Sequence, residues 1–250
     1  GCRKEPFDKK WIDYREELCI AMRRFDSLSI IDEFVKHVSF SKEEILDSGI
    51  YDHAKIHVKN YPDVFISLNE GNPIGSVIDP HGYIGFEEGL IALIEKPKFM
   101  EYLIFSLYDA YIPQMMALKE CGADGYIGSE TMCSTDLISP SVYRDLIFNA
   151  QKHFYNAIEN FGLTPIAYFT GDIMPLLDDI AQLGCKAVMV EEPKKTANLN
   201  IGEIHRKLYG KVAQFGNIDS IHDLLLGSFD HICDRVIEQL NQVSGKGFIL

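Results

Sequence analysis

The chain has 250 residues, of which 46% are hydrophobic and 24% are charged, a composition that allows one domain with a sizeable core. Its formal net charge of -13 comes without a basic stripe, which argues against a nucleic-acid partner. Scattered cysteines, and apolar runs shorter than the roughly eighteen residues of a membrane span, predict a cytoplasmic protein without membrane contact.

Residues 1–60 predict a helical part whose place in the fold the sequence does not define. Apolar residues recur at helical spacing between positions 7 and 25, which predicts a helix there. Ser41 and Glu44 form a capping-box pattern, in which each side chain accepts from the other residue's backbone N–H, so a short helix should follow Ser41. The apolar residues of 30–35 fit a helix and a strand equally well.

The next part of the chain predicts two extended segments followed by two helices. Residues 64–68 and 74–78 are short apolar runs, and the Gly and Pro residues between them mark a turn. Residues 86–95 predict one helix. Residues 97–120 predict a longer helix with an apolar stripe, in which Pro113 would introduce a kink.

Between Ala123 and Asp219, four short apolar strands each end in polar residues and lead into an amphipathic helix. We predict these strands at 123–128, 164–169, 186–190 and 212–215, followed by a last strand at 247–250. Continuous apolar runs are typical of buried parallel strands, and their alternation with helices indicates βαβ units.

About six strands follow from residue 64, whereas a closed (β/α)8 barrel has eight. The chain also begins at Gly1 rather than at Met, and it stops at Leu250 inside a predicted strand. We therefore expect an α/β protein with a (β/α)8 TIM barrel that is incomplete at the N-terminus and truncated in its last strand. It would form a single domain of residues 1–250, with the barrel units in 61–250.

Carboxylates gather at the predicted strand ends, at Glu130, Asp172, Glu191, Glu192 and Asp219. Parallel strands deliver their polar tips to one face, where a carboxylate can act as a general acid or base or hold a hard metal ion. Asp172 and Asp219 would equally suit helix N-caps, which is the structural alternative.

Side chains alternate along a strand, so Glu191 should face the barrel interior or its mouth if Val190 faces outward. Buried carboxylates without partners are rare, which favours a functional role for Glu191 or Glu192. The alternative is that Lys194 and Lys195, which follow at once, simply pair with these carboxylates.

Three other polar residues near strand ends are candidates for substrate contact or proton transfer. Tyr168 and Thr170 alternate at the end of 164–169 and can point the same way, and a tyrosine there can donate a hydrogen bond or a proton. His81 follows the early strands and could act as a base, although an ordinary loop histidine is the commoner case.

Seven short motifs follow one another between residues 61 and 250: Gly122-Ala123-Asp124, Ile138-Ser139-Pro140, Tyr168-Phe169-Thr170-Gly171-Asp172, Val190-Glu191-Glu192, Phe215-Gly216-Asn217-Ile218-Asp219, Leu225-Leu226-Gly227-Ser228 and Gly247-Phe248-Ile249-Leu250. Their order and spacing resemble the uroporphyrinogen decarboxylase superfamily, which includes the decarboxylase and the cobamide-dependent methyltransferases. The resemblance implies a (β/α)8 barrel with its site at the C-terminal mouth, which agrees with the strand count.

The resemblance also bears on the reaction. In the zinc-dependent methyltransferases of this superfamily one strand ends His-x-Cys-Gly, where this chain has Tyr168-Phe169-Thr170-Gly171. Two zinc ligands are thereby replaced, so we expect no metal site, whereas a corrinoid cofactor remains implied. The Glu191-Glu192 pair is similar to the methyltransferase branch, because the decarboxylase typically has an Asp there.

From the residues and the resemblance together we expect methyl transfer involving a corrinoid, with a corrinoid protein as the partner. The expected catalytic residues are Glu130, Tyr168, Asp172 and Glu191, and the expected substrate-binding residues are His81, Thr170, Glu192 and Asn217. The first alternative is decarboxylation of a tetrapyrrole such as uroporphyrinogen in porphyrin biosynthesis, although a net charge of -13 does little to attract a polycarboxylate. The second alternative, suggested by the replaced His-x-Cys, is a catalytically lapsed barrel that acts as a binding subunit.

Overall fold

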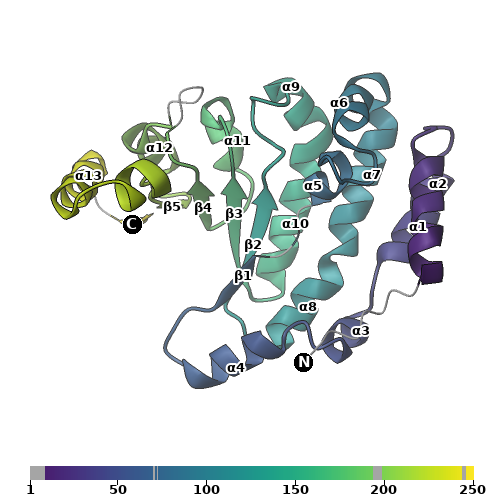
Figure 1. Ribbon diagram of the computed structural model, residues 1–250, viewed down its shortest axis with the longest axis horizontal. Helices are drawn as coiled ribbons and strands as arrows, with labels where there is room; N and C mark the ends of the chain where they lie inside the picture. The colour runs from purple at the N-terminus through teal and green to yellow at the C-terminus, as the bar shows by residue number, and fades with distance from the viewer. Residues whose placement is uncertain (1–8, 70, 72, 194–198, 244–245) are drawn as a thin grey trace.

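The computed structural model describes residues 9–69, 71, 73–193, 199–243 and 246–250. Within these residues, six strands form one parallel sheet whose spatial order follows the chain order. The strands are β1 (Ser67–Asn69), β2 (Gly125–Glu130), β3 (Thr164–Phe169), β4 (Ala187–Val190), β5 (Ala213–Phe215) and β6 (Phe248–Ile249). Helical segments connect each strand to the next, so the fold is an incomplete (β/α)8 barrel (Figure 1).

The helices fall into three groups along the chain. Before β1 lie α1 (Lys9–Met22), α2 (Ser29–Val38), α3 (Lys42–Asp47) and α4 (Asp52–Asn60). Between β1 and β2 lie α5 (Pro73–Ile78), α6 (Phe86–Glu95), α7 (Pro97–Ala110) and α8 (Ile112–Glu120). After β2 lie α9 (Pro140–Val142), the π-helical segment η1 (Tyr143–Ile147), α10 (Phe148–Asn160), the 3-10 segment η2 (Met174–Leu176), α11 (Leu177–Ile180), α12 (Ile201–Leu208), the π-helical segment η3 (Ser220–Leu225) and α13 (Phe229–Gln242). Among the described helices, none has both the length and the apolar character that crossing a membrane requires.

The N-terminal helices form the outer edge of the molecule. Helices α1 and α2 lie side by side, and α2 packs against α7 (Figure 1). The ambiguous segment 30–35 belongs to α2, because Ile31 and Phe34 form a buried face at helical spacing. The capping box before α3 is confirmed, since the Ser41 side chain accepts from the Glu44 N–H and the Glu44 carboxylate accepts from the Ser41 N–H.

The prediction of an extended segment at 74–78 is wrong, because this segment is helix α5. Pro73 is its first residue, a position where the missing N–H of proline costs little. Ile74, Val77 and Ile78 are then buried at helical spacing, and α5 packs against α6 and α7. Periodicity alone does not separate a strand from a buried helix in so short an apolar run.

The other predicted elements after residue 61 are confirmed with small changes at their ends. The predicted helix at 97–120 is two helices, α7 and α8, which meet at Tyr111. Pro113 lies in the first turn of α8, where it breaks no internal hydrogen bond. The predicted strand at 64–68 is reduced to β1, and the five later strands occur where expected.

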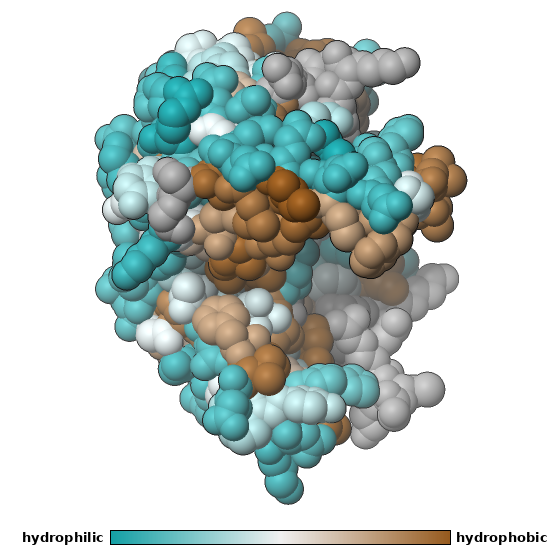
Figure 2. Space-filling model, turned by 90° about the vertical axis from the view of Figure 1, so that its left-hand side faces the viewer, coloured by the Kyte–Doolittle hydropathy of each residue, from teal (hydrophilic) through white to brown (hydrophobic). Residues whose placement is uncertain are grey.

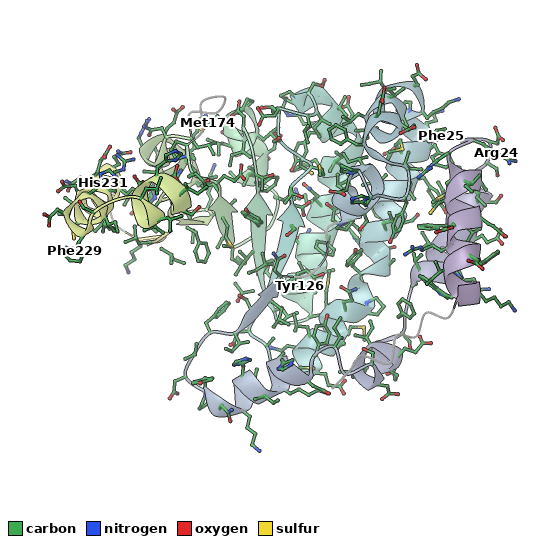
Figure 3. The ribbon with its side chains drawn as sticks, viewed as in Figure 1. Arg24, Phe25, Tyr126, Met174, Phe229 and His231 are labelled. Atoms are coloured by element: carbon green, nitrogen blue, oxygen red, sulfur yellow. The ribbon has the colours of Figure 1, made fainter. Side chains whose placement is uncertain are left out.

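The two faces of the sheet have different surroundings. Tyr126 and Glu130 of β2 point toward α10, whose Tyr155 hydroxyl lies 2.8 Å from the Glu130 carboxylate. Tyr126 is fully buried and lies near the middle of the molecule (Figure 3). Ile127 and Ser129, which alternate with them, point the other way, so Ser129 shares the second face with its neighbour in register, Tyr168 of β3. This second face is the barrel interior, and Ser129 and Tyr168 are only half-buried there.

Exposed apolar side chains gather at the end of the molecule that bears α13. They are Ile221, Leu224, Leu225, Leu226, Phe229, Ile237, Leu240 and Ile249. Figure 2 views the molecule from this end and shows apolar side chains in the middle of the face. β6 is the last strand of the described sheet, so this end is the open edge of the incomplete barrel.

Candidate active site

Hydrogen bonds hold together the loops that follow β3, β4 and β5. Glu191, directly after β4, accepts a hydrogen bond on its carboxylate from the Gly171 N–H after β3, at 2.7 Å. The Asn217 side chain, after β5, donates to the backbone carbonyl of Glu191 at 3.2 Å and to that of Leu199 at 3.1 Å. The fold therefore brings Glu191 and Asn217 together, as expected for the tips of parallel strands.

Gly171 and Asp172 present two consecutive backbone N–H groups to carboxylates. The first donates to Glu191, and the second donates to Asp136 at 2.6 Å. Gly171 has a φ of 70°, and a Cβ atom there would lie 2.5 Å from the Asp136 carboxylate, so the loop requires glycine. The Asp172 carboxylate accepts from the Met174 N–H at 3.0 Å. The N-cap of the 3-10 segment η2 is Ile173, so Asp172 forms an Asx turn one residue earlier and is not the helix cap that the sequence suggested.

Tyr168 and Thr170 occupy the end of β3. Tyr168 is in register with Ser129 and Met189, so its side chain faces the barrel interior with theirs. The Thr170 hydroxyl donates to the backbone carbonyl of Thr131 at 2.8 Å and ties the end of β3 to the loop after β2. Tyr168 thus adds a phenol to the interior face, whereas the Thr170 hydroxyl supports the backbone.

Glu130, predicted as catalytic, lies on the opposite face of the sheet from Tyr168. It is fully buried, and its carboxylate accepts from the Tyr108 hydroxyl at 2.7 Å, the Tyr155 hydroxyl at 2.8 Å and the Gln151 amide at 2.5 Å. Burial raises the pKa of Glu130, and the hydrogen bonds from these donors oppose the rise. Glu130 therefore links the end of β2 to α7 and α10, away from the other strand tips.

His81, predicted to bind substrate, also lies apart from the loops after β3, β4 and β5. It lines a cleft with Arg15 and Tyr83, which places it against α1. In Figure 1, α1 and β5 lie at opposite ends of the molecule. His81 is therefore not part of the cluster around Glu191.

Glu192 and Asp219 lie near a histidine that the sequence did not indicate. The Asp219 carboxylate lies 2.9 Å from Nδ1 of His222 and also accepts from the His222 N–H at 2.7 Å. The side-chain hydrogen bond raises the pKa of His222, and the charge of Glu192 makes a smaller contribution. Lys194 and Lys195, the alternative partners of the glutamate pair, lie outside the described residues.

Two further residues hold the site in place without having been predicted. Gln239 of α13 donates to the side-chain oxygen of Asn217 at 3.0 Å, and Asp136 accepts from the Asp172 N–H. Gln239 is buried on a helix, so a polar residue at a core position was an available signal. Asp136 lies in a loop without a motif, and only the folded chain reveals its position.

The described residues do not fit a zinc ion. They contain no group of three or more His, Cys, Asp or Glu side chains arranged to hold a metal. Tyr168 and Thr170 offer a phenol and a hydroxyl in place of the imidazole and thiolate that zinc prefers. The interior face offers instead a carboxylate, a phenol and loops anchored by backbone hydrogen bonds, which can bind and orient a polar substrate.

Comparisons with known proteins agree with this architecture. Residues 75–250 match the model of the family described as uroporphyrinogen decarboxylase (URO-D). A relative named Methylcobamide:CoM methyltransferase MtaA, from Methanosarcina barkeri (strain Fusaro / DSM 804), is 27% identical over 140 residues, which cover 56% of this chain and 39% of that protein. A second protein of the same name from Methanosarcina barkeri is 28% identical over 140 residues, with the same coverage.

A solved structure shares the fold. The methyltransferase from Methanosarcina mazei superposes with a TM-score of 0.64 at 22% identity, over 78% of this chain and 56% of that chain. This chain spans less than half the length of the two curated relatives it matches. Because the family match extends over well more than half of the residues, this chain belongs to the uroporphyrinogen decarboxylase family.

Proposed function

We propose that this protein transfers a methyl group between a corrinoid and a small molecule, at the face where β3, β4 and β5 end. Two curated relatives are named as methylcobamide methyltransferases, and the solved structure that shares the fold is a methyltransferase. The observation that carries the proposal within this chain is the fixed carboxylate of Glu191, held by the Gly171 N–H beside the end of β3. A corrinoid protein is the proposed partner, because a corrinoid would have to reach this face to exchange its methyl group.

Methyl transfer by direct displacement depends mainly on placing two reactants in line. We assign the orientation of the small molecule to Glu191, which can accept a hydrogen bond, and to Tyr168, whose phenol can donate one. Asp172 and Asn217 keep the surrounding loops in place through the backbone contacts described above. Thr170 supports the same loops, and Glu192 adds negative charge beside them.

The experiment is a demethylation assay with the full-length protein. Methylcobalamin and a panel of small thiols are incubated with the protein, and loss of the cobalt–methyl bond is followed by visible absorption. The proposal predicts protein-dependent demethylation with at least one acceptor. Release of carbon dioxide from uroporphyrinogen, with no demethylation, would establish the decarboxylase instead. Corrinoid binding without either reaction would establish a lapsed barrel that acts as a binding subunit.

A further inference from the structure

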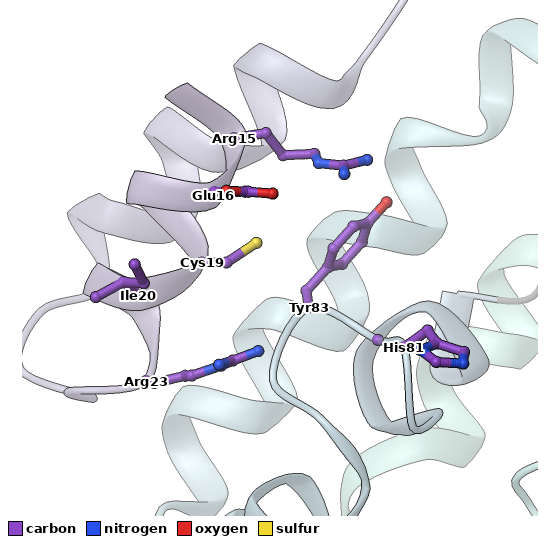
Figure 4. A pocket seen from close by; sticks show the side chains of 8 residues that line it. Arg15, Glu16, Cys19, Ile20, Arg23, His81 and Tyr83 are labelled. Carbon is purple, nitrogen blue, oxygen red and sulfur yellow. The ribbon is translucent and has the colours of Figure 1, made fainter. Parts of the chain in front are cut away.

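A cleft of about 370 Å³ lies between α1 and the loop that joins α5 to α6 (Figure 4). The side chains that define its chemistry are Arg15, Glu16, Cys19, Arg23, His81 and Tyr83. Helix α1 lies outside the residues matched by the family, whereas the loop lies inside them. None of these lining residues belongs to the loops directly after β3, β4 and β5, so the cleft is separate from the proposed methyl-transfer face.

The cleft concentrates positive charge in a strongly acidic chain. Arg15 comes from α1 and Arg23 from the turn directly after it, against the single carboxylate of Glu16. The net charge of the chain is -13, so a cleft lined by two guanidinium groups differs from the rest of the chain. Among the ion pairs of the described residues, none involves Arg15 or Arg23, whereas Arg144 and others on the surface are paired.

The two arginines are spaced along one side of the cleft. They lie eight positions apart in the sequence, which corresponds to about 12 Å of rise along a helix, and Cys19 lies midway between them. Figure 4 shows Arg15 and the Tyr83 hydroxyl at one end of the cleft and Arg23 and His81 at the other. Arg15 also lies 5.5 Å from the centre of the Trp11 ring, a cation–π contact that restrains its side chain.

The centre of the cleft adds no negative charge of its own. Burial raises the pKa of the Cys19 thiol, although Arg15 and Arg23 oppose this rise, so the thiol stays neutral. Burial likewise raises the pKa of Tyr83 to about 12, so its hydroxyl keeps its proton and can donate a hydrogen bond.

We propose that this cleft binds a small organic anion with two carboxylate groups, one held by Arg15 and Tyr83 and the other by Arg23 and His81. Guanidinium groups bind carboxylates through paired, charge-assisted hydrogen bonds. A ligand with one anionic group would engage only one end of the cleft. The volume lies at the lower end of the range of roughly 300–1,000 Å³ that is usual for small-molecule sites.

Calorimetric titration of the full-length protein tests the proposal. The ligands are linear dicarboxylates from succinate to suberate, with acetate as the single carboxylate, all at constant ionic strength. We expect saturable binding with an optimum chain length, and acetate should bind at least about tenfold more weakly because it reaches one arginine only.

Variants identify the residues that bind. Arg15→Gln and Arg23→Gln should each weaken binding of the best dicarboxylate by at least about tenfold, and Glu16→Gln should strengthen it. Arg24→Gln is the matched control, because Arg24 is exposed in the turn after α1 and does not line the cleft (Figure 3). Melting curves check that each variant is folded.

Three results would overturn the proposal: no saturable heat with any dicarboxylate, acetate binding as tightly as the best of them, or equal weakening by Arg24→Gln. The titration contains no corrinoid and no methyl group. A failed titration would therefore not contradict the proposed methyl transfer. A failed demethylation assay would likewise not contradict dicarboxylate binding in the cleft.

Discussion

The carboxylate of Glu130 closes a hydrogen-bonded network between β2 and the helices that cover it. Donors from Tyr108, Tyr155 and Gln151 converge on its two oxygens. A buried charge without such donors would be very costly, which explains why three polar side chains surround this position. Burial still outweighs them and raises the pKa of Glu130 above its ordinary value of 4.5.

Glu130→Gln should therefore change how stability depends on pH. Because the pKa of Glu130 is raised in the native state, the native state keeps this proton to higher pH than the unfolded state does. Above about pH 4.5, the native wild-type protein binds more protons than the unfolded chain, and the contribution of Glu130 to stability falls as pH rises through the native pKa. The glutamine does not titrate, so the variant should gain stability relative to wild type over this range.

Urea unfolding at several pH values, from about 4 to about 7, measures this difference in the free energy of unfolding. Glu159→Gln provides the control, since Glu159 is exposed on α10, the helix that carries the Glu130 partners Gln151 and Tyr155. Parallel curves for wild type and Glu130→Gln would contradict a raised native pKa.

The placement of these carboxylates could be predicted only in part. The predicted strand at 186–190 is a clear apolar run that ends directly before Glu191. The sequence was therefore enough to predict that Glu191 lies at the mouth of the barrel. In β2, Tyr126 and Ile127 are consecutive apolar residues, and a strand with apolar residues on both faces does not reveal which face the helices cover. Tyr126 packs against Phe154 of α10, so its face of β2 is the one that the helices cover. Glu130 lies on the same face and therefore points away from the mouth.

The loop after β3 depends on a glycine, and Gly171→Ala should destabilise the protein more than Gly210→Ala does. The two residues have similar φ angles, 70° and 74°, so both variants carry the left-handed backbone strain of about 1–2 kcal/mol. A Cβ atom at position 171 would also lie 2.5 Å from the Asp136 carboxylate and 2.6 Å from the Ser134 hydroxyl. At position 210 no described atom lies within 4 Å.

We expect the clash to cost Gly171→Ala a further loss of about 1–3 kcal/mol in the free energy of unfolding. Urea unfolding of the two variants gives the difference directly. Turnover should fall in Gly171→Ala as well, because the Gly171 N–H holds Glu191. Equal losses of stability in the two variants would show that the side chains of Asp136 and Ser134 move aside without cost, which would contradict close packing around Gly171.

Local sequence patterns predicted most helices and strands correctly, and the wrong prediction at α5 has a physical cause. The capping box before α3 and the amphipathic helix α6 carry signals that depend on neighbouring residues alone. Helix α5 has six residues, and its β-branched residues Ile74, Val77 and Ile78 favour a strand by composition. Contacts with α6 and α7 override that preference, and the sequence of α5 does not contain them.

At the scale of the whole molecule, the order of the strands was predictable because each strand–helix unit adds one parallel strand beside the last. The position of the N-terminal helices was not, since their packing on α7 joins residues far apart in the chain. The cleft between α1 and the loop after α5 arises from this packing. It explains why His81, predicted at the barrel mouth, lies against α1 instead.

The most direct test of the proposed active face is corrinoid demethylation by the full-length protein carrying Glu191→Gln. The glutamine oxygen can still accept from the Gly171 N–H, so the loops should keep their arrangement and the melting temperature should hardly change. Glu203→Gln makes the same chemical change at an exposed position of α12 and should keep the wild-type rate. We predict that Glu191→Gln lowers the rate on the order of a hundredfold, as for loss of a group that contacts the reacting molecule. A wild-type rate in this variant would contradict the assignment.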